Sequence, residues 1–115
     1  MPRLTHPSGL PQEVLSAIEI FGNQARVEIL HRLVTEGPLT ATQLGDRVGA
    51  ARMSTHSHLR VLEDAGVISA DVEPSKRPGR RVTWSINAAR VQEVGSTLLA
   101  YVTAPGAVDG SLPRP

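Results

Sequence analysis

Hydrophobic residues recur at intervals of three and four along the first half of the chain, a spacing typical of amphipathic helices. Pro11 fits the first turn of a helix, where a missing N–H has no cost, and Gly22 ends that helix. Asn23 is a good N-cap for a second helix, which ends at Gly37 and Pro38. The apolar residues that recur at helical spacing in the first helix are Val14, Leu15, Ile18 and Phe21. In the second helix, a wide apolar face is formed by Val27, Ile29, Leu30, Leu33 and Val34.

A short helix is predicted next, within the stretch TATQLGDRVG. Thr40 and Gln43 match the capping-box pattern at its start, although Thr42 could cap it instead. Gly49 is the kind of residue that ends a helix in the left-handed conformation. A tight turn at this glycine would lead directly into a further helix.

That further helix lies in ARMSTHSHLRVLEDAGVI, residues 51–68. It is predicted to start near residues 52–54 and to end at Gly66, with Leu59 and Leu62 facing the core and Thr55 and Val61 as further candidates. Its polar side is rich in Arg, Ser and His. Two helices joined by a tight glycine turn, the second with such a polar face, are typical of a helix-turn-helix.

The pattern then changes from a period of 3.6 to a period of 2. Residues 67–73 are predicted to form a strand, and PSKRPGR is a turn rich in Pro and Gly. In RRVTWSI, Val82, Trp84 and Ile86 alternate with polar residues, as in a half-buried strand. The result is a basic hairpin, and its place directly after a helix-turn-helix suits a wing.

Asn87 can cap a last helix, so the predicted fold is mainly α with a small β-hairpin wing: an α+β winged helix-turn-helix. We expect residues 1–10 to be a flexible arm, residues 11–102 to be one domain for DNA binding and dimerisation, and residues 103–115 to be a disordered tail. No apolar run is long enough for a membrane span, which favours a cytoplasmic protein.

Composition excludes several kinds of chemistry. The chain has no cysteine, which removes disulfides, thiolate nucleophiles and thiolate metal sites. The formal net charge is only +1, but the distribution is uneven: residues 76–81 hold four cations and no acid, and Arg47, Arg52 and Arg60 precede them. Such a local basic patch favours a polyanionic partner.

The sequence resembles the ArsR family of winged-helix bacterial transcriptional regulators over about residues 14–101. FGNQARVEILHRLVTEGPLTATQLGDRVG is similar to that family's second and third helices, including an arginine at Arg26. ARMSTHSHLRVLEDAGVI is similar to its recognition helix, with HLRVLEDAG the most specific segment, and GRRVTWSI to its second wing strand. The resemblance implies a repressor that binds operator DNA.

Two features depart from the family pattern. Ala51 stands where the family has a serine N-cap, and alanine cannot cap, which leaves the start of the recognition helix open. The metal-sensing motifs are absent, because LTATQLGD has no cysteine and the last helix offers only Glu93. The resemblance therefore implies neither a metal nor any other cofactor, and no residue set indicates a small-molecule effector.

The predicted DNA contacts come from the recognition helix and the wing. Arginine reads guanine in the major groove, small hydroxyls suit phosphates or base edges, and basic wing residues would follow the minor groove or backbone. The candidate residues are Arg52, Ser54, Thr55, His56, Ser57, His58, Arg60, Lys76, Arg77, Arg80 and Arg81. The expected target is a pseudo-palindromic duplex operator.

The terminal helices predict a homodimer. A narrow apolar stripe on the last helix, completed by the first helix, is typical of a helix–helix seam. The candidate interface residues are Val14, Ile18, Phe21, Val91, Val94, Leu98 and Tyr101. The alternative is that both helices simply cover the core of the monomer.

Each assignment has a structural alternative. The basic hairpin tip could be a solvated loop, His58 could bond a backbone group, and Trp84 could be core. His56 and His58 diverge by about 200° on a helix, so one chain cannot use both for one metal. The rival functions are a DNA-binding module for recombination or plasmid maintenance and a winged helix for protein contacts. An enzyme is disfavoured, because no P-loop, dinucleotide glycine motif or His–Glu metal helix is present.

Overall fold

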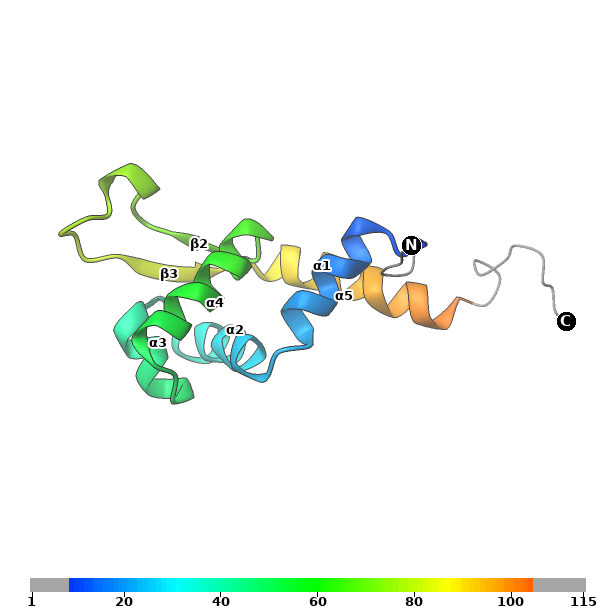
Figure 1. Cartoon of the computed structure of the whole chain (residues 1–115), viewed down its shortest axis with the longest axis horizontal. Coiled ribbons are helices and arrows are strands. Elements are labelled where there is room, and N and C mark those ends of the chain that lie inside the picture. The colour runs from blue at the N-terminus through cyan, green and yellow to red at the C-terminus, as the bar shows by residue number, and fades with distance from the viewer. Residues whose placement is uncertain (1–8, 105–115) are drawn as a thin grey trace, which may run out of the picture.

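The computed structural model describes residues 9–104, and the chain forms five α-helices and three short strands in this region (Figure 1). The elements are α1 (Gln12–Phe21), α2 (Gln24–Glu36), β1 (Leu39–Thr40), α3 (Ala41–Val48), α4 (Arg52–Asp64), β2 (Ile68–Ala70), a 3-10 turn (Pro74–Lys76), β3 (Thr83–Ile86) and α5 (Ala88–Thr103). This order confirms the predicted winged helix-turn-helix. The N-terminal arm and the C-terminal tail predicted above lie largely outside the described residues, although α5 itself extends to Thr103.

The predicted helix caps are confirmed in their side-chain chemistry. The Asn23 side chain accepts from the Arg26 backbone N–H, and the Asn87 side chain accepts from that of Arg90. At the start of α3, Thr40 and Gln43 form a complete capping box, with Thr40 as the cap. These side chains satisfy backbone donors that the first turn of a helix leaves without a partner.

The sheet has three strands in the order β1-β3-β2, all antiparallel. The strand predicted over residues 67–73 is shorter, because at each end one of the two ladder hydrogen bonds is replaced by another bond. The Asn87 N–H still donates to the Val67 carbonyl, and the Asp71 N–H to the Thr83 carbonyl. The Val67 N–H donates to the Leu62 carbonyl at the end of α4, and the Asp71 carboxylate accepts from the Thr83 N–H at 2.9 Å. That hydrogen bond lowers the pKa of Asp71. Beyond it, the wing continues as an extended loop.

The core lies between the sheet and helices α1 to α4. Its largest fully buried side chains are Ile20, Ile29, Leu44, Leu59, Leu62, Ile68, Val14, Val67 and Thr55. Trp84 is 6% exposed, which confirms the core interpretation. The inward face predicted for α2 was too wide: Val27 is 43% and Val34 is 61% exposed. Only the stripe formed by residues 29, 30 and 33 reaches the core, since a single helix face is narrower than the run of apolar residues.

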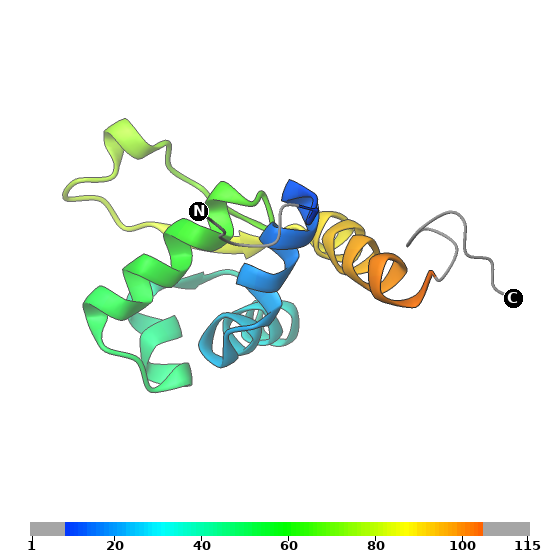
Figure 2. The same cartoon turned by 45° about the vertical axis from the view of Figure 1, so that its right-hand side comes forward.

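Helices α1 and α5 pack against each other at the end of the molecule opposite the wing (Figures 1 and 2). Val14 and Val94 are 2% and 4% exposed within this one chain, and the Phe21 ring lies beside Gly95. Part of the stripe predicted for a dimer therefore covers the core of the monomer. No helix within residues 9–104 has the length and apolar character needed to cross a membrane.

Candidate nucleic-acid interface

The turn between α3 and α4 brings the two helices into close contact. Gly45 is buried, and a Cβ at this position would lie 3.0 Å from Thr55 Oγ1 and 3.2 Å from the Ala50 carbonyl oxygen. Gly49 has a φ of 70°, the left-handed conformation that glycine adopts without strain. The predicted glycine turn is confirmed, and it fixes the angle at which α4 leaves the core.

Helix α4 begins at Arg52, with Ala51 at the N-cap and no side-chain hydrogen bond there. The absent serine therefore removes a cap without moving the start of the helix to Ser54. Thr55 donates from Oγ1 to the Ala51 carbonyl at 3.0 Å and is 1% exposed. A side chain this buried cannot reach a base edge, so the prediction of Thr55 as a DNA contact is corrected to a core position.

The outward face of α4 carries five of the predicted contact residues. All five are exposed, and the core-facing residues Leu59 and Leu62 hold the helix from its other side. These residues are Arg52, Ser54, His56, Ser57 and Arg60. Their side chains are available for a ligand because the opposite face of the helix packs against the core.

His58, also predicted as a contact, lies half-buried between α4 and α2. Its Nδ1 accepts a hydrogen bond from Arg26 Nε at 3.2 Å, and Arg26 also donates to the Glu19 carbonyl at 2.7 Å. Burial, and then the positive charge of Arg26, lower the pKa of His58. The neutral imidazole thus joins α4 to α2 and to the end of α1, which favours the structural interpretation of this histidine.

The wing contains a third departure from the predicted DNA contacts. Arg77 pairs with Glu63 of α4 through two hydrogen bonds, of 2.7 and 3.3 Å, and its Nε donates to the Val72 carbonyl at 2.7 Å. Its guanidinium also lies 5.0 Å from the centre of the Trp84 ring. Arg77 is therefore used inside the protein, where it holds the wing against α4; its pKa is raised by the Glu63 carboxylate.

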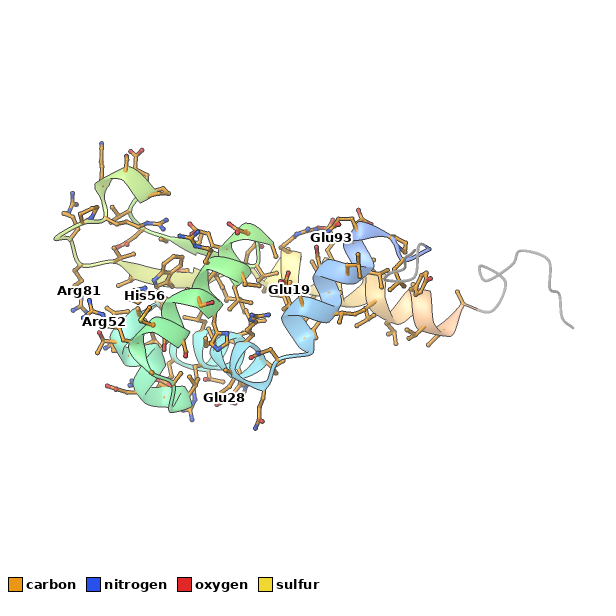
Figure 3. All side chains as sticks on the ribbon, viewed as in Figure 1. Glu19, Glu28, Arg52, His56, Arg81 and Glu93 are labelled. Atoms are coloured by element: carbon orange, nitrogen blue, oxygen red, sulfur yellow. The ribbon has the colours of Figure 1, made fainter. Side chains whose placement is uncertain are left out.

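The remaining wing cations point outward. Lys76 pairs only with the exposed Glu73, at 3.4 Å, and Arg80 and Arg81 are exposed. Figure 3 shows Arg81 close to Arg52 and His56 at one end of the molecule. Arg52, His56, Arg80 and Arg81 line an open groove of about 840 Å³ between the wing, the start of α3 and the start of α4. The helix surface and the basic loop thus form one face.

Sequence reasoning missed three contributors to this face. Glu63 and Arg26 position other site residues, and Gln43 of α3 lines the groove. The capping pattern fixes Gln43 in the first turn of α3, and the pairing of β1 with β3 brings that turn beside the wing. No sequence signal could have paired Glu63 with Arg77, fourteen positions away across an irregular loop.

Within the described part of the chain, no group of three or more His, Asp, Glu or Cys side chains could hold a metal ion. The face instead offers guanidinium, imidazole and hydroxyl groups around a concave surface. These groups donate hydrogen bonds to phosphate oxygens and base edges. The arrangement is suited to binding a polyanion.

Comparisons with known proteins agree with this geometry. Residues 21–69 match a family profile described as a helix-turn-helix domain. The HTH-type transcriptional regulator NmtR of Mycobacterium tuberculosis is 28% identical over 82 residues, which are 71% of this chain and 63% of that protein. The aligned region thus spans less than two thirds of that relative.

Solved structures match over more of the chain. The ArsR family transcriptional regulator RHA00566 has a TM-score of 0.63 at 23% identity, with 90% of this chain and 97% of that chain covered. The chain thus shares its winged helix-turn-helix fold with an ArsR family transcriptional regulator. The transcriptional repressor BigR of Xylella fastidiosa also shares this fold, with a TM-score of 0.56, 18% identity and coverage of 80% of this chain and 87% of that chain.

Proposed function

We propose that this protein binds a duplex operator through α4 and the wing and thereby represses transcription. The observation that carries the proposal is the shared groove lined by Arg52, His56 and Arg81. A recognition helix contacts base edges with its first turns, and α4 exposes its polar side chains in those turns.

The contacts divide into two classes. Arg52, Ser54, His56 and Ser57 face outward at the start of α4 and would read bases in the major groove. Arg60, Lys76, Arg80 and Arg81 would meet phosphates, which fix orientation without reading sequence. Arg77 and His58 would not contact DNA; they position the surface by holding the wing and α4 in place.

A homodimer would present two such surfaces to a pseudo-palindromic site, with recognition helices about 34 Å apart. Support comes from apolar side chains that α1 and α5 leave exposed: Ile18 at 46%, Leu99 at 63%, Tyr101 at 43% and Val102 at 65%. The predicted interface residues Phe21, Val91 and Leu98 are partly buried beside them. The repressor mode is supported by the fold shared with BigR.

Changing Arg52 and His56 to Ala together tests the DNA-binding proposal. Each base contact is worth about 1–3 kcal/mol, so affinity for an operator selected from random duplexes should fall on the order of 100-fold. Because both residues are exposed, circular dichroism melting should be unchanged. Arg32→Ala removes one positive charge on α2, where Arg32 pairs with Glu28 and Glu36, and serves as the control. Unchanged operator affinity in the double variant would reject the assignment of α4.

Light scattering after gel filtration tests the dimer. Wild-type protein should elute as a dimer at micromolar concentration, and Ile18→Glu should shift it to a monomer by placing a charge in the seam. Val34→Glu adds the same charge to an exposed position of α2 and should leave the dimer intact. A monomeric wild-type protein would remove the dimer from the proposal.

A further inference from the structure

Met53 is the most exposed large hydrophobic side chain of residues 9–104, at 84% of its full accessible area. It lies in the first turn of α4 and has no packing role in the core cluster. A single exposed apolar residue is ordinary on a protein surface. Its meaning here depends on its position within the proposed DNA-binding face.

That position is the centre of the outward stripe of α4. Met53, Ser57 and Arg60 follow each other at intervals of four and three, so they lie on one side of the helix. The opposite side, which includes Leu59 and Leu62, is fully buried. Any surface that α4 meets through its first turns must therefore meet the Met53 side chain, which polar neighbours surround.

We propose that Met53 reads the C5-methyl group of a thymine in the major groove. This inference rests on the proposed DNA-binding function and adds a specificity determinant to it. In the major groove, the base pairs present hydrogen-bond donors and acceptors and one apolar group, the thymine methyl. A thioether side chain cannot donate a hydrogen bond and accepts one only weakly, so contact with that methyl is its favourable match.

The contact predicts which bases the first turn of α4 prefers. Arg52 lies beside Met53 in the first turn and is suited to guanine, whereas Met53 is suited to thymine. The operator should therefore contain, in each half-site, a thymine whose methyl group contributes to affinity. Flexible methionine tolerates small differences in approach, because its three rotatable bonds adapt to the shape of the groove.

Deoxyuridine substitution tests the contact at the level of one methyl group. An operator is first selected from random duplex DNA with the wild-type protein, and each thymine is then replaced in turn by deoxyuridine. At one thymine per half-site, wild-type affinity should fall about fourfold for each methyl group removed. Met53→Ala and Met53→Gln should bind the thymine and uracil operators equally, whereas Met53→Leu should keep the preference for thymine. Val34→Ala, an exposed apolar residue of α2, should behave as wild type.

The outcomes separate this inference from the function beneath it. Operator binding with no uracil-sensitive position, or with a sensitivity that Met53→Ala and Met53→Gln retain in full, overturns the methyl contact and leaves the DNA-binding proposal standing. Failure of the wild-type protein to select any duplex overturns both. The variants should fold normally, since Met53 is exposed, and equal melting temperatures would verify this.

Discussion

Helix α4 and the wing use their arginines differently. Arg52 and Arg60 of α4 extend from a helix whose other face is buried in the core, so their guanidinium groups are exposed. The wing loop buries almost nothing, and Arg77 instead anchors it to Glu63, to the Val72 carbonyl and to Trp84. An element that lacks a core needs side-chain contacts to fix its position. A basic residue in such an element can therefore be structural.

If the wing tip binds phosphates, replacing either Arg80 or Arg81 with Ala, in separate variants, should weaken binding to all sequences alike. Removal of one phosphate-binding arginine lowers the slope of log affinity against log salt by about 0.9, and affinity by on the order of tenfold at 0.1 M salt. Titrations at several salt concentrations, on operator and random duplexes, measure both quantities. Arg32→Ala, on α2, is the matched removal of one charge. An unchanged salt dependence of affinity would show that the two arginines do not contact phosphates.

Breaking the Arg77 anchor should give a different signature from removing a phosphate-binding residue. Glu63→Gln removes a negative charge near the DNA, which on electrostatic grounds alone would strengthen binding. Because it frees Arg77 from its partner, we expect operator affinity to fall several-fold, and stability by about 1–3 kcal/mol. Glu73→Gln removes the same charge from the exposed pair with Lys76 and should reduce neither operator affinity nor stability.

Tighter operator binding by Glu63→Gln would show that the anchor has no positioning role. A double-mutant cycle with Arg77→Ala isolates the interaction, because the effects of the two changes should be strongly non-additive.

The half-buried His58, which joins α4 to Arg26 of α2, should make the stability of the protein depend on pH. The pKa of His58 is lower in the folded protein than its ordinary value of 6.5. The unfolded chain therefore binds a proton more readily, and stability should decrease as the pH falls below about 6.5. Protonation would also remove the acceptor for Arg26 Nε.

Urea unfolding of His58→Gln at several values between about pH 5 and 8 tests this, since glutamine can accept the same bond without titrating. The variant should lose less stability in acid than the wild type. His31→Gln, at an exposed position of α2, should follow the wild type. Identical pH profiles for His58→Gln and wild type would contradict the prediction.

Because α4 starts without a side-chain cap, adding a capping residue should increase the stability of the protein slightly. Ala51 has the extended backbone of an N-cap, with φ −67° and ψ 159°, but no side-chain acceptor. Ala51→Ser should stabilise the protein by about 1 kcal/mol, which raises the melting temperature by about 4–8 °C for a domain of this size. Ala51→Val offers no acceptor and should give no gain. A melting temperature of Ala51→Ser equal to that of wild type would mean that water already satisfies the free backbone donors.

Local chemistry explains why so much of the fold could be predicted. The caps at Asn23, Thr40 and Asn87 and the turn at Gly49 each depend on residues within four positions of one another. The hairpin follows from alternation around Trp84. The bounds of its first strand could not be predicted, because two N–H groups that would complete the ladder bond to other acceptors: that of Val67 to the Leu62 carbonyl and that of Thr83 to the Asp71 carboxylate.

The site was predictable only where exposure follows from helix periodicity. Arg52, His56 and Ser57 face outward because they lie on a different side of α4 from the buried stripe. Thr55 and His58 belong to the same polar run, but packing against Gly45 and the bond from Arg26 place them inside. A small hydroxyl or a neutral imidazole is compatible with both environments, so composition could not decide between them.

The sequence by itself determined the order of the elements, the ends of most helices and the existence of a basic surface. These properties depend on hydrophobic periodicity and on contacts between near neighbours in the chain. Only the tertiary structure decided which cations are free for a ligand and which are already paired. Glu63 and Arg77, like Arg26 and His58, are brought together by folding across many residues, and no local pattern encodes such a contact.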